Sequence, residues 1–171
     1  MTADRTRAPG RLRVYPERCQ GCQACVVACS LAHEGYVDPI HARLRVMLDP
    51  LRAEHEVRIC HQCRRAPCAA ACPRGAISYV SPSVPTSRRS PRQEPGDSAV
   101  AGTGRSSGGG VGGYWAVDAA ACDGCGLCVA ACPFHVLMLA YDGDTIRICD
   151  TCGGAPECVA SCPAGALVWE V

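Results

Sequence analysis

The sequence is poor in the residues that usually build a protein core. It contains one phenylalanine, two tryptophans and five tyrosines among 171 residues, beside eighteen glycines and thirteen prolines. A core of aromatic and branched side chains is therefore expected to be thin, and small domains with thin cores usually depend on cross-links or bound metals. Because metal binding contributes to folding free energy, we expect the fold to be largely unformed without bound metal.

Long apolar runs and targeting segments are also missing. No run approaches the length needed to cross a bilayer, and the first ten residues lack both the apolar stretch of a signal peptide and an adjacent arginine pair. These absences predict a cytoplasmic protein with no direct membrane insertion, although an export signal on a partner subunit is compatible with them. No grouping of serine, histidine and carboxylate residues suggests nucleophilic or acid–base catalysis, so we expect that the chain is not an enzyme by itself.

Lysine is absent as well, so the basic side chains other than histidine are all arginines. Residues 1–92 contain 15 arginines and 7 acidic residues, a balance of +8, whereas residues 93–171 contain 2 arginines and 9 acidic residues, a balance of −7. An arginine-only complement can reflect base composition alone, but oppositely charged faces also steer docking. The sequence leaves both interpretations open.

Cysteine, by contrast, is abundant. The sixteen cysteines form four groups of four with none left over. The groups are Cys19, Cys22, Cys25 and Cys29; Cys60, Cys63, Cys68 and Cys72; Cys122, Cys125, Cys128 and Cys132; and Cys149, Cys152, Cys158 and Cys162. The first and third groups read C-x2-C-x2-C-x3-C, the spacing that binds [4Fe–4S] clusters in bacterial ferredoxins. Four cysteines for each cluster predict four [4Fe–4S] clusters, with all sixteen cysteines as metal ligands.

The spacing favours iron–sulfur clusters over other cysteine sites. Three sulfurs of one tight loop surround three corners of a cluster, and in two-cluster ferredoxins the fourth cysteine binds the neighbouring cluster. Structural zinc normally joins two distant cysteine pairs, and disulfides need an oxidising compartment, so both fit poorly. A mixed set with one [3Fe–4S] centre is a further alternative, which the complete set of cysteines does not favour.

The neighbours of the four groups are similar, so the chain is interpreted as a repeat of one unit. An extended stretch precedes each group, the later cysteines lie on short helices of small residues, and an apolar strand follows three of the groups. Pro73, Pro133 and Pro163 directly follow last cysteines and are expected to end those helices. This rhythm predicts an α+β fold. The expected strands cover residues 11–15, 43–46, 56–59, 76–80, 114–118, 136–140, 145–148 and 166–171.

Residues 81–113 break the rhythm. They are rich in serine, proline, glycine and arginine, a composition typical of flexible segments. Because expected strands 76–80 and 114–118 flank them, we interpret them as the expanded tip of a hairpin.

Two histidines and two tryptophans have simpler interpretations. His61 and His135 lie close to cysteines in the sequence, but cysteine fills every ligand position, so both are expected at the surface or beside a cluster. Trp115 and Trp169 lie on expected strands, where they are interpreted as core or cluster-shielding residues.

These motifs resemble the four-cluster, ferredoxin-like electron-transfer subunits that accompany molybdenum and tungsten enzymes, hydrogenase complexes and carbon monoxide dehydrogenase. The resemblance covers about residues 11–80 and 114–171. It rests on Cys19-Gln-Gly-Cys-Gln-Ala-Cys-Val-Val-Ala-Cys29, on Cys60-His-Gln-Cys with Ala66-Pro-Cys-Ala-Ala-Ala-Cys-Pro73, and on Ile148-Cys-Asp-Thr-Cys152. Residues 30–46 look most like the small iron–sulfur subunits of bacterial tungsten aldehyde oxidoreductases.

The resemblance implies two bacterial-ferredoxin-like modules nested in the sequence. Module A contains residues 11–54 and 142–171, and module B contains residues 55–141 with the insertion 81–113. The sequence alone equally permits sequential pairing of the first motif with the second. The implied ligand sets are Cys19, Cys22 and Cys25 with Cys162; Cys149, Cys152 and Cys158 with Cys29; Cys60, Cys63 and Cys68 with Cys132; and Cys122, Cys125 and Cys128 with Cys72.

The implied function is single-electron transfer from cluster to cluster, to or from a catalytic oxidoreductase partner, because four fully ligated clusters leave no open position for a substrate. A tungsten or molybdenum pterin aldehyde oxidoreductase is the first expectation. The alternatives are a hydrogenase, formate dehydrogenase or carbon monoxide dehydrogenase complex, or a self-stacking electron wire in which the oppositely charged halves of successive copies meet. A flavin or ferredoxin redox partner is also compatible, whereas nucleic-acid binding is not expected.

Overall fold

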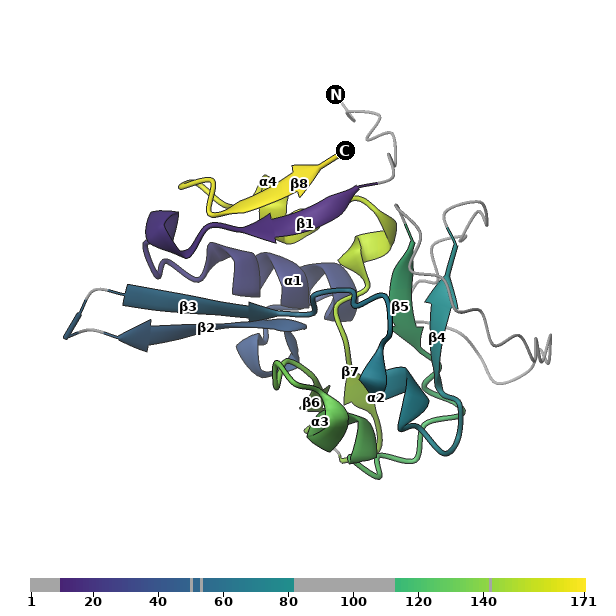
Figure 1. Cartoon of the computed structure of the whole chain (residues 1–171). Coiled ribbons are helices and arrows are strands. Elements are labelled where there is room, and N and C mark those ends of the chain that lie inside the picture. Colours follow the sequence, from purple (N-terminus) through teal and green to yellow (C-terminus); the bar gives the residue numbers. More distant parts are fainter. Residues whose placement is uncertain (1–9, 50, 53, 82–112, 142) are drawn as a thin grey trace.

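The computed structural model describes residues 10–49, 51–52, 54–81, 113–141 and 143–171, and these form short helices and two-stranded ribbons (Figure 1). This mixture agrees with the expected α+β class. The α-helices are α1 (Ala24–Glu34), α2 (Pro67–Ala70), α3 (Leu127–Ala131) and α4 (Glu157–Ala160), with 3-10 turns η1 (Pro16–Arg18), η2 (Pro39–His41) and η3 (Thr151–Gly153). The strands are β1 (Arg11–Val14), β2 (Leu44–Asp49), β3 (Glu54–Ile59), β4 (Ile77–Val80), β5 (Tyr114–Val117), β6 (Met138–Leu139), β7 (Ile146–Arg147) and β8 (Leu167–Glu170).

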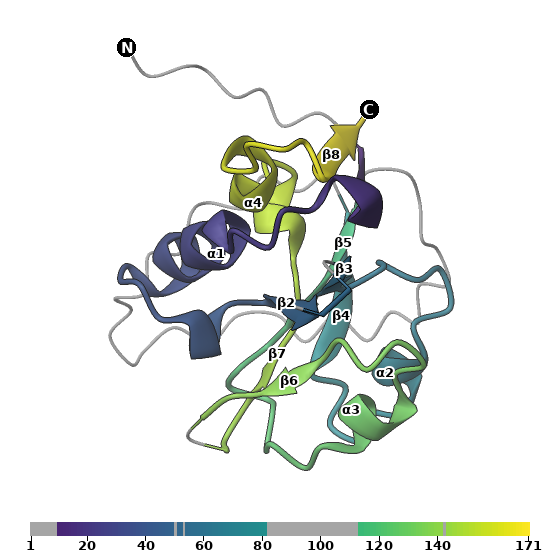
Figure 2. The same ribbon diagram turned by 90° about the vertical axis from the view of Figure 1, so that its left-hand side faces the viewer.

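The first and last strands of the chain pair with each other. β1 and β8 are antiparallel, with Leu12 opposite Trp169 and Val14 opposite Leu167. Helix α1 packs against α4 next to this ribbon, in the upper part of both views (Figures 1 and 2). The two ends of the described chain therefore form one structural unit, although more than a hundred residues separate them.

A second unit comes from the middle of the chain. β4 and β5 are antiparallel, with Ile77 opposite Val117 and Val80 opposite Tyr114. Helices α2 and α3 pack against each other in the lower part of both views, near the β6–β7 ribbon (Figures 1 and 2). The pairing of β4 with β5 confirms the arms of the predicted hairpin, whereas most of the predicted insertion, residues 82–112, lies outside the described residues.

Two elements are longer than the sequence predicted, and two are shorter. Helix α1 continues to Glu34, and the strand expected at residues 43–46 becomes β2, paired along its whole length with β3. The strands expected at residues 136–140 and 145–148 shorten to the two-residue β6 and β7. The other predicted strands are present within a residue or two.

Cysteine supplies a large part of the buried core. Eight cysteines are buried, together with small and branched residues, while Trp115 is a buried aromatic residue at 9% exposure. This composition confirms the thin conventional core that the sequence predicted. Among the described residues, no helix is both long and apolar enough to cross a membrane. The buried cysteines are Cys25, Cys29, Cys60, Cys68, Cys128, Cys132, Cys149 and Cys158.

Candidate iron–sulfur sites

The first cysteine loop and the last cysteine of the chain line the same pocket. Its wall contains Cys19, Cys22 and Cys25 from the first group and Cys162 from the fourth. Val46 and Val57, which face each other across the β2–β3 hairpin, and Leu167 of β8 also line it. The pairing of β1 with β8 brings these distant thiols together, and the aliphatic side chains limit the access of water.

Three further groups of neighbouring thiols are identified by their effect on the pKa of a buried cysteine. Burial raises the pKa of Cys158, and the thiols of Cys152 and Cys29 add to the rise. Burial likewise raises the pKa of Cys60 to about 12, with contributions from thiols of its own group and from Cys132 of the third. Cys29, the fourth cysteine of the first group, thus lies near the fourth group. Cys132, the fourth cysteine of the third group, lies near the second group.

The last of these sets of neighbouring thiols joins the third and second cysteine groups. Burial raises the pKa of Cys128 to about 11, and the thiols of Cys72 and Cys122 raise it further. Because these buried thiols are protonated at neutral pH, binding a metal requires that they release protons.

Backbone amides point at several of the sulfurs. The amide of Arg43 donates to Cys29 Sγ at 3.2 Å, and the amides of Ala76 and Ala166 donate at 3.3 Å to Cys72 Sγ and Cys162 Sγ, four residues earlier in each case. Such donors stabilise thiolate and tune the potential of iron–sulfur clusters. The free thiols gather in groups, several with amide donors beside the sulfurs, and this donor set fits [4Fe–4S] clusters by its chemistry.

The cysteine loops need residues in the left-handed backbone region. Gly124 has a φ of +66°, and a side chain there would collide with the backbone carbonyl of Gly143. Gly21, at +65°, has His55 and Leu48 side chains closely packed against it. Glycine is therefore required at positions 21 and 124 by the backbone conformation and by packing against neighbouring segments.

One glutamine connects the two units. Gln62, between Cys60 and Cys63, accepts a hydrogen bond from the amide of Trp115 at 2.7 Å and donates one to the carbonyl of Cys149. The indole Nε1 of Trp115 donates to the carbonyl of Cys63 at 3.0 Å. The second and fourth cysteine loops are thus held together, and the thiol of Cys60 contributes to the raised pKa of the fully buried Cys149.

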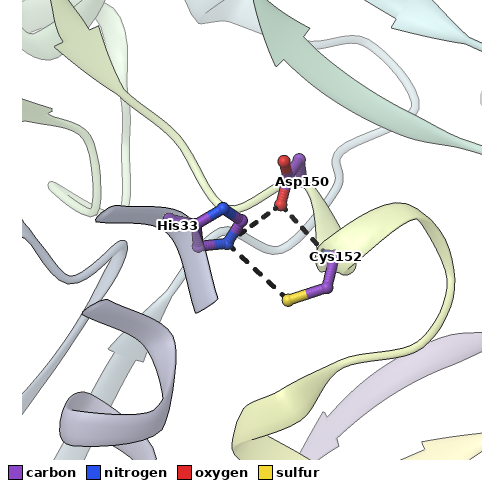
Figure 3. A group of neighbouring side chains, drawn as sticks. All are labelled: His33, Asp150 and Cys152. Atoms are coloured by element: carbon purple, nitrogen blue, oxygen red, sulfur yellow. Dashed lines mark hydrogen bonds and ion pairs between the residues drawn. The ribbon is translucent and has the colours of Figure 1, made fainter. Parts of the chain in front are cut away.

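A histidine that the sequence analysis did not assign lies beside a cysteine sulfur. His33 Nε2 lies 3.6 Å from Cys152 Sγ and 3.5 Å from Asp150 Oδ1 (Figure 3). Burial lowers the pKa of His33, although Asp150 opposes the change. The two histidines that the sequence singled out, His61 and His135, are both exposed, and the ring of His61 stacks on Phe134.

Family models match all four cysteine groups. Residues 59–136 and residues 121–167 each match a 4Fe–4S dicluster domain, and residues 16–35 match a 4Fe–4S binding domain. Similar proteins include the aliphatic sulfonate oxidoreductase polyferredoxin-like subunit of Pyrococcus furiosus, 32% identical over 82% of this chain. The thiosulfate reductase electron transfer subunit of Salmonella typhi is 33% identical over 80% of the chain.

Residues 16–35 and 59–167 therefore match 4Fe–4S domains, and the chain is similar to 4Fe–4S electron-transfer subunits. It binds multiple [4Fe–4S] clusters in ferredoxin-like domains. It covers 64% and 58% of the lengths of the two relatives above, so it spans less than two thirds of them. A shorter match joins it to formate hydrogenlyase subunit 2 of Escherichia coli, 42% identical over 39% of this chain and 32% of that relative.

His33 and Gln62 are two of the residues around the cysteines that sequence reasoning missed. His33 follows Cys25 and Cys29 at steps of four, which places all three on one face of a helix. That spacing indicates a contact between His33 and the cysteine sites once the helix is known to reach Glu34. Gln62 carried no such signal, because its partners Trp115 and Cys149 are distant in the sequence.

Proposed function

We propose that the chain is a non-catalytic relay that carries single electrons through four [4Fe–4S] clusters in two nested ferredoxin-like modules. Module A comprises residues 11–54 and 142–171, and module B comprises residues 55–141. When bound, each cluster accepts and returns one electron. The four ligand sets join three cysteines of one loop to the fourth cysteine of the partner loop, as the family resemblance implies.

Several contacts support nested rather than sequential pairing. The pocket formed by the first loop contains Cys162 of the fourth group, and β1 pairs with β8 beside it. Helix α1 packs on α4, and α2 packs on α3. Within these pairs, Cys29 lies near Cys158 and Cys72 lies near Cys128.

The exposure of the cysteines carries the relay proposal. Cys22 and Cys125 are exposed, and they belong to the proposed first and last ligand sets. The two inner sets contain no exposed cysteine, and Cys60 and Cys149 of those sets lie near each other where the modules meet. Electron partners therefore reach the two ends of the series, while the protein shields the middle from water.

The proposed partner is a catalytic oxidoreductase subunit. The relatives are named as subunits of a sulfonate oxidoreductase and a thiosulfate reductase, and their electron-transfer role supports the same role for this chain. The resemblance of residues 30–46 favours a tungsten or molybdenum pterin aldehyde oxidoreductase. We further propose that clusters are inserted in the cytoplasm, where the sixteen free thiols stay reduced.

Anaerobic purification from the native host tests this function. The proposal predicts a brown chain with about sixteen iron and about sixteen sulfide per chain, co-purifying with a larger subunit that contains a pterin metal and reduces the chain when its substrate is added. A colourless, zinc-containing chain would refute the cluster proposal. A loaded chain that co-purifies with a catalytic subunit lacking tungsten and molybdenum would refute the choice of partner.

A further inference from the structure

Two charged pairs and a histidine surround the cysteines that α1 and the η3 loop bring together. Arg43 Nη1 lies 2.5 Å from Asp150 Oδ2, and Arg147 pairs with Glu34. All four of these charged side chains, with His33, contribute to one electrostatic neighbourhood. Because the two arginines and the two carboxylates balance, the group adds little net charge around the sulfurs.

Each member of the group is fixed by its local structure. Asp150 precedes η3, where its Oδ1 accepts a hydrogen bond from the amide of Cys152 at 3.0 Å, while Arg43 holds its other oxygen. His33 lies on the last turn of α1, one turn beyond Cys29. The imidazole is therefore aimed at Cys152 from the same helix that supplies Cys29 to the neighbouring thiols (Figure 3).

The Nε2–H group of His33 has two possible acceptors within reach, Cys152 Sγ and Asp150 Oδ1. With its hydrogen on Nε2, the ring of His33 faces Cys152 Sγ at 3.6 Å and Asp150 Oδ1 at 3.5 Å. Asp150 is already engaged by Arg43 and by the amide of Cys152, which satisfies much of its capacity to accept. The sulfur of Cys152 also accepts from the amide of Glu157, which leaves it able to accept from the imidazole once Cys152 is a thiolate.

We propose that His33 donates a hydrogen bond from Nε2 to the Cys152 thiolate and thereby raises the reduction potential of the cluster that Cys149, Cys152, Cys158 and Cys29 hold. The inference rests on the proposed function, since it requires that cluster. Reduction places additional negative charge on the cluster and its sulfur ligands, and a donor to sulfur stabilises the reduced form more than the oxidised form. Asp150 acts as a positioning residue: it orients both the ring and the η3 loop.

The charge of Asp150 has the opposite effect on the same cluster. A carboxylate beside a thiolate disfavours the addition of an electron, although Arg43 offsets much of this. Removing the hydrogen bond of His33 and removing the charge of Asp150 should therefore shift one potential in opposite directions. A purely structural role for both residues gives no reason for opposite signs.

The test is a redox titration of the purified, cluster-loaded chain, followed by electron paramagnetic resonance. His33→Leu removes the donor, and His33→Gln retains an N–H group at a similar reach. We expect His33→Leu to decrease the equilibrium constant for one reduction step about tenfold, which equals 59 mV for a one-electron couple, while His33→Gln restores most of it. Asp150→Asn is expected to increase the same constant.

The matched control is His41→Leu. His41 also pairs with an aspartate, through Nδ1 to Asp38 Oδ2 at 2.9 Å, but the contacts described for its ring, to Asp38 and Tyr36, include no cysteine sulfur. This variant should leave all the potentials unchanged. A Cys152→Ser variant identifies the affected step, because the ligand change must alter the same cluster.

The outcomes separate the inference from the function on which it depends. If clusters load fully and His33→Leu shifts no potential, or shifts a step different from the one altered by Cys152→Ser, the role of His33 is wrong and the relay stands. Failure of His33→Gln to restore the potential also overturns it. If the unaltered chain takes up no clusters, the proposed function itself fails.

Discussion

Replacing Gln62 by leucine is expected to loosen the contact between the two modules while leaving each cysteine group intact. Leucine has a similar size, but it can neither accept from the amide of Trp115 nor donate to the carbonyl of Cys149. Each lost hydrogen bond costs about 1 kcal/mol, and up to about 3 kcal/mol where the partner is left buried. Trp115 and Cys149, the partners left behind, are both buried, so about 1 kcal/mol for each bond is a lower bound and the total is at least about 2 kcal/mol.

Hydrogen–deuterium exchange of the cluster-loaded chain measures this loss directly. A decrease of at least about 2 kcal/mol in the free energy of local opening corresponds to at least about thirtyfold faster exchange at the amide of Trp115. Gln62→Glu should keep that amide protected, because a carboxylate still accepts from it, while losing the bond to Cys149. Gln20→Leu, at an exposed glutamine in the first cysteine loop, is the control. Unchanged exchange at Trp115 in Gln62→Leu would refute the bridging role.

Further predictions concern the loops, the thiols and the charged halves. Gly124→Ala should lose its cluster to a chelator much faster than Gly126→Ala, since both have positive φ but only the first collides with backbone; equal rates would contradict this. Burial raises the pKa of Cys25 and Cys128 to about 11. Because the folded-state pKa lies above the usual value, these thiols keep their protons across the neutral range, and cluster loading should improve as the pH rises from about 6.5 to about 8.5; a flat profile would count against it. If the charged halves stack, size-exclusion chromatography should show assemblies at low salt that dissociate as salt rises, and monomer-sized elution throughout would exclude the electron wire.

The cysteine spacing was sufficient to predict the cofactor class and the alternation of strand, loop and short helix. Spacing reports a local requirement, because three sulfurs must converge from one loop. The hairpin arms around residues 81–113 were predictable for a similar reason, since two apolar strands flank a polar segment. The family resemblance then implied that the first cysteine group pairs with the fourth.

What the sequence could not provide are contacts between segments that are far apart in the chain. Helix α1 packs against α4, and His33 on its last turn reaches Cys152 of the distant fourth cysteine group. The two-residue strands β6 and β7 are shorter than their apolar runs, because neighbouring residues such as Val136 and Ile148 are buried in the core instead of being paired in the ribbon. Periodicity does not distinguish these two uses of an apolar residue.

The central claim, four clusters in nested modules, is tested most directly by counting intact [4Fe–4S] clusters in paired cysteine variants. Cys162 and Cys72 are well matched, since both are half-buried and both accept an amide hydrogen bond at 3.3 Å. Nested ligation predicts that Cys22→Ala with Cys162→Ala disrupts one cluster, because both residues serve the same one, and leaves about three. Cys22→Ala with Cys72→Ala should disrupt two and leave about two. Sequential ligation predicts the reverse, and that result would contradict the account.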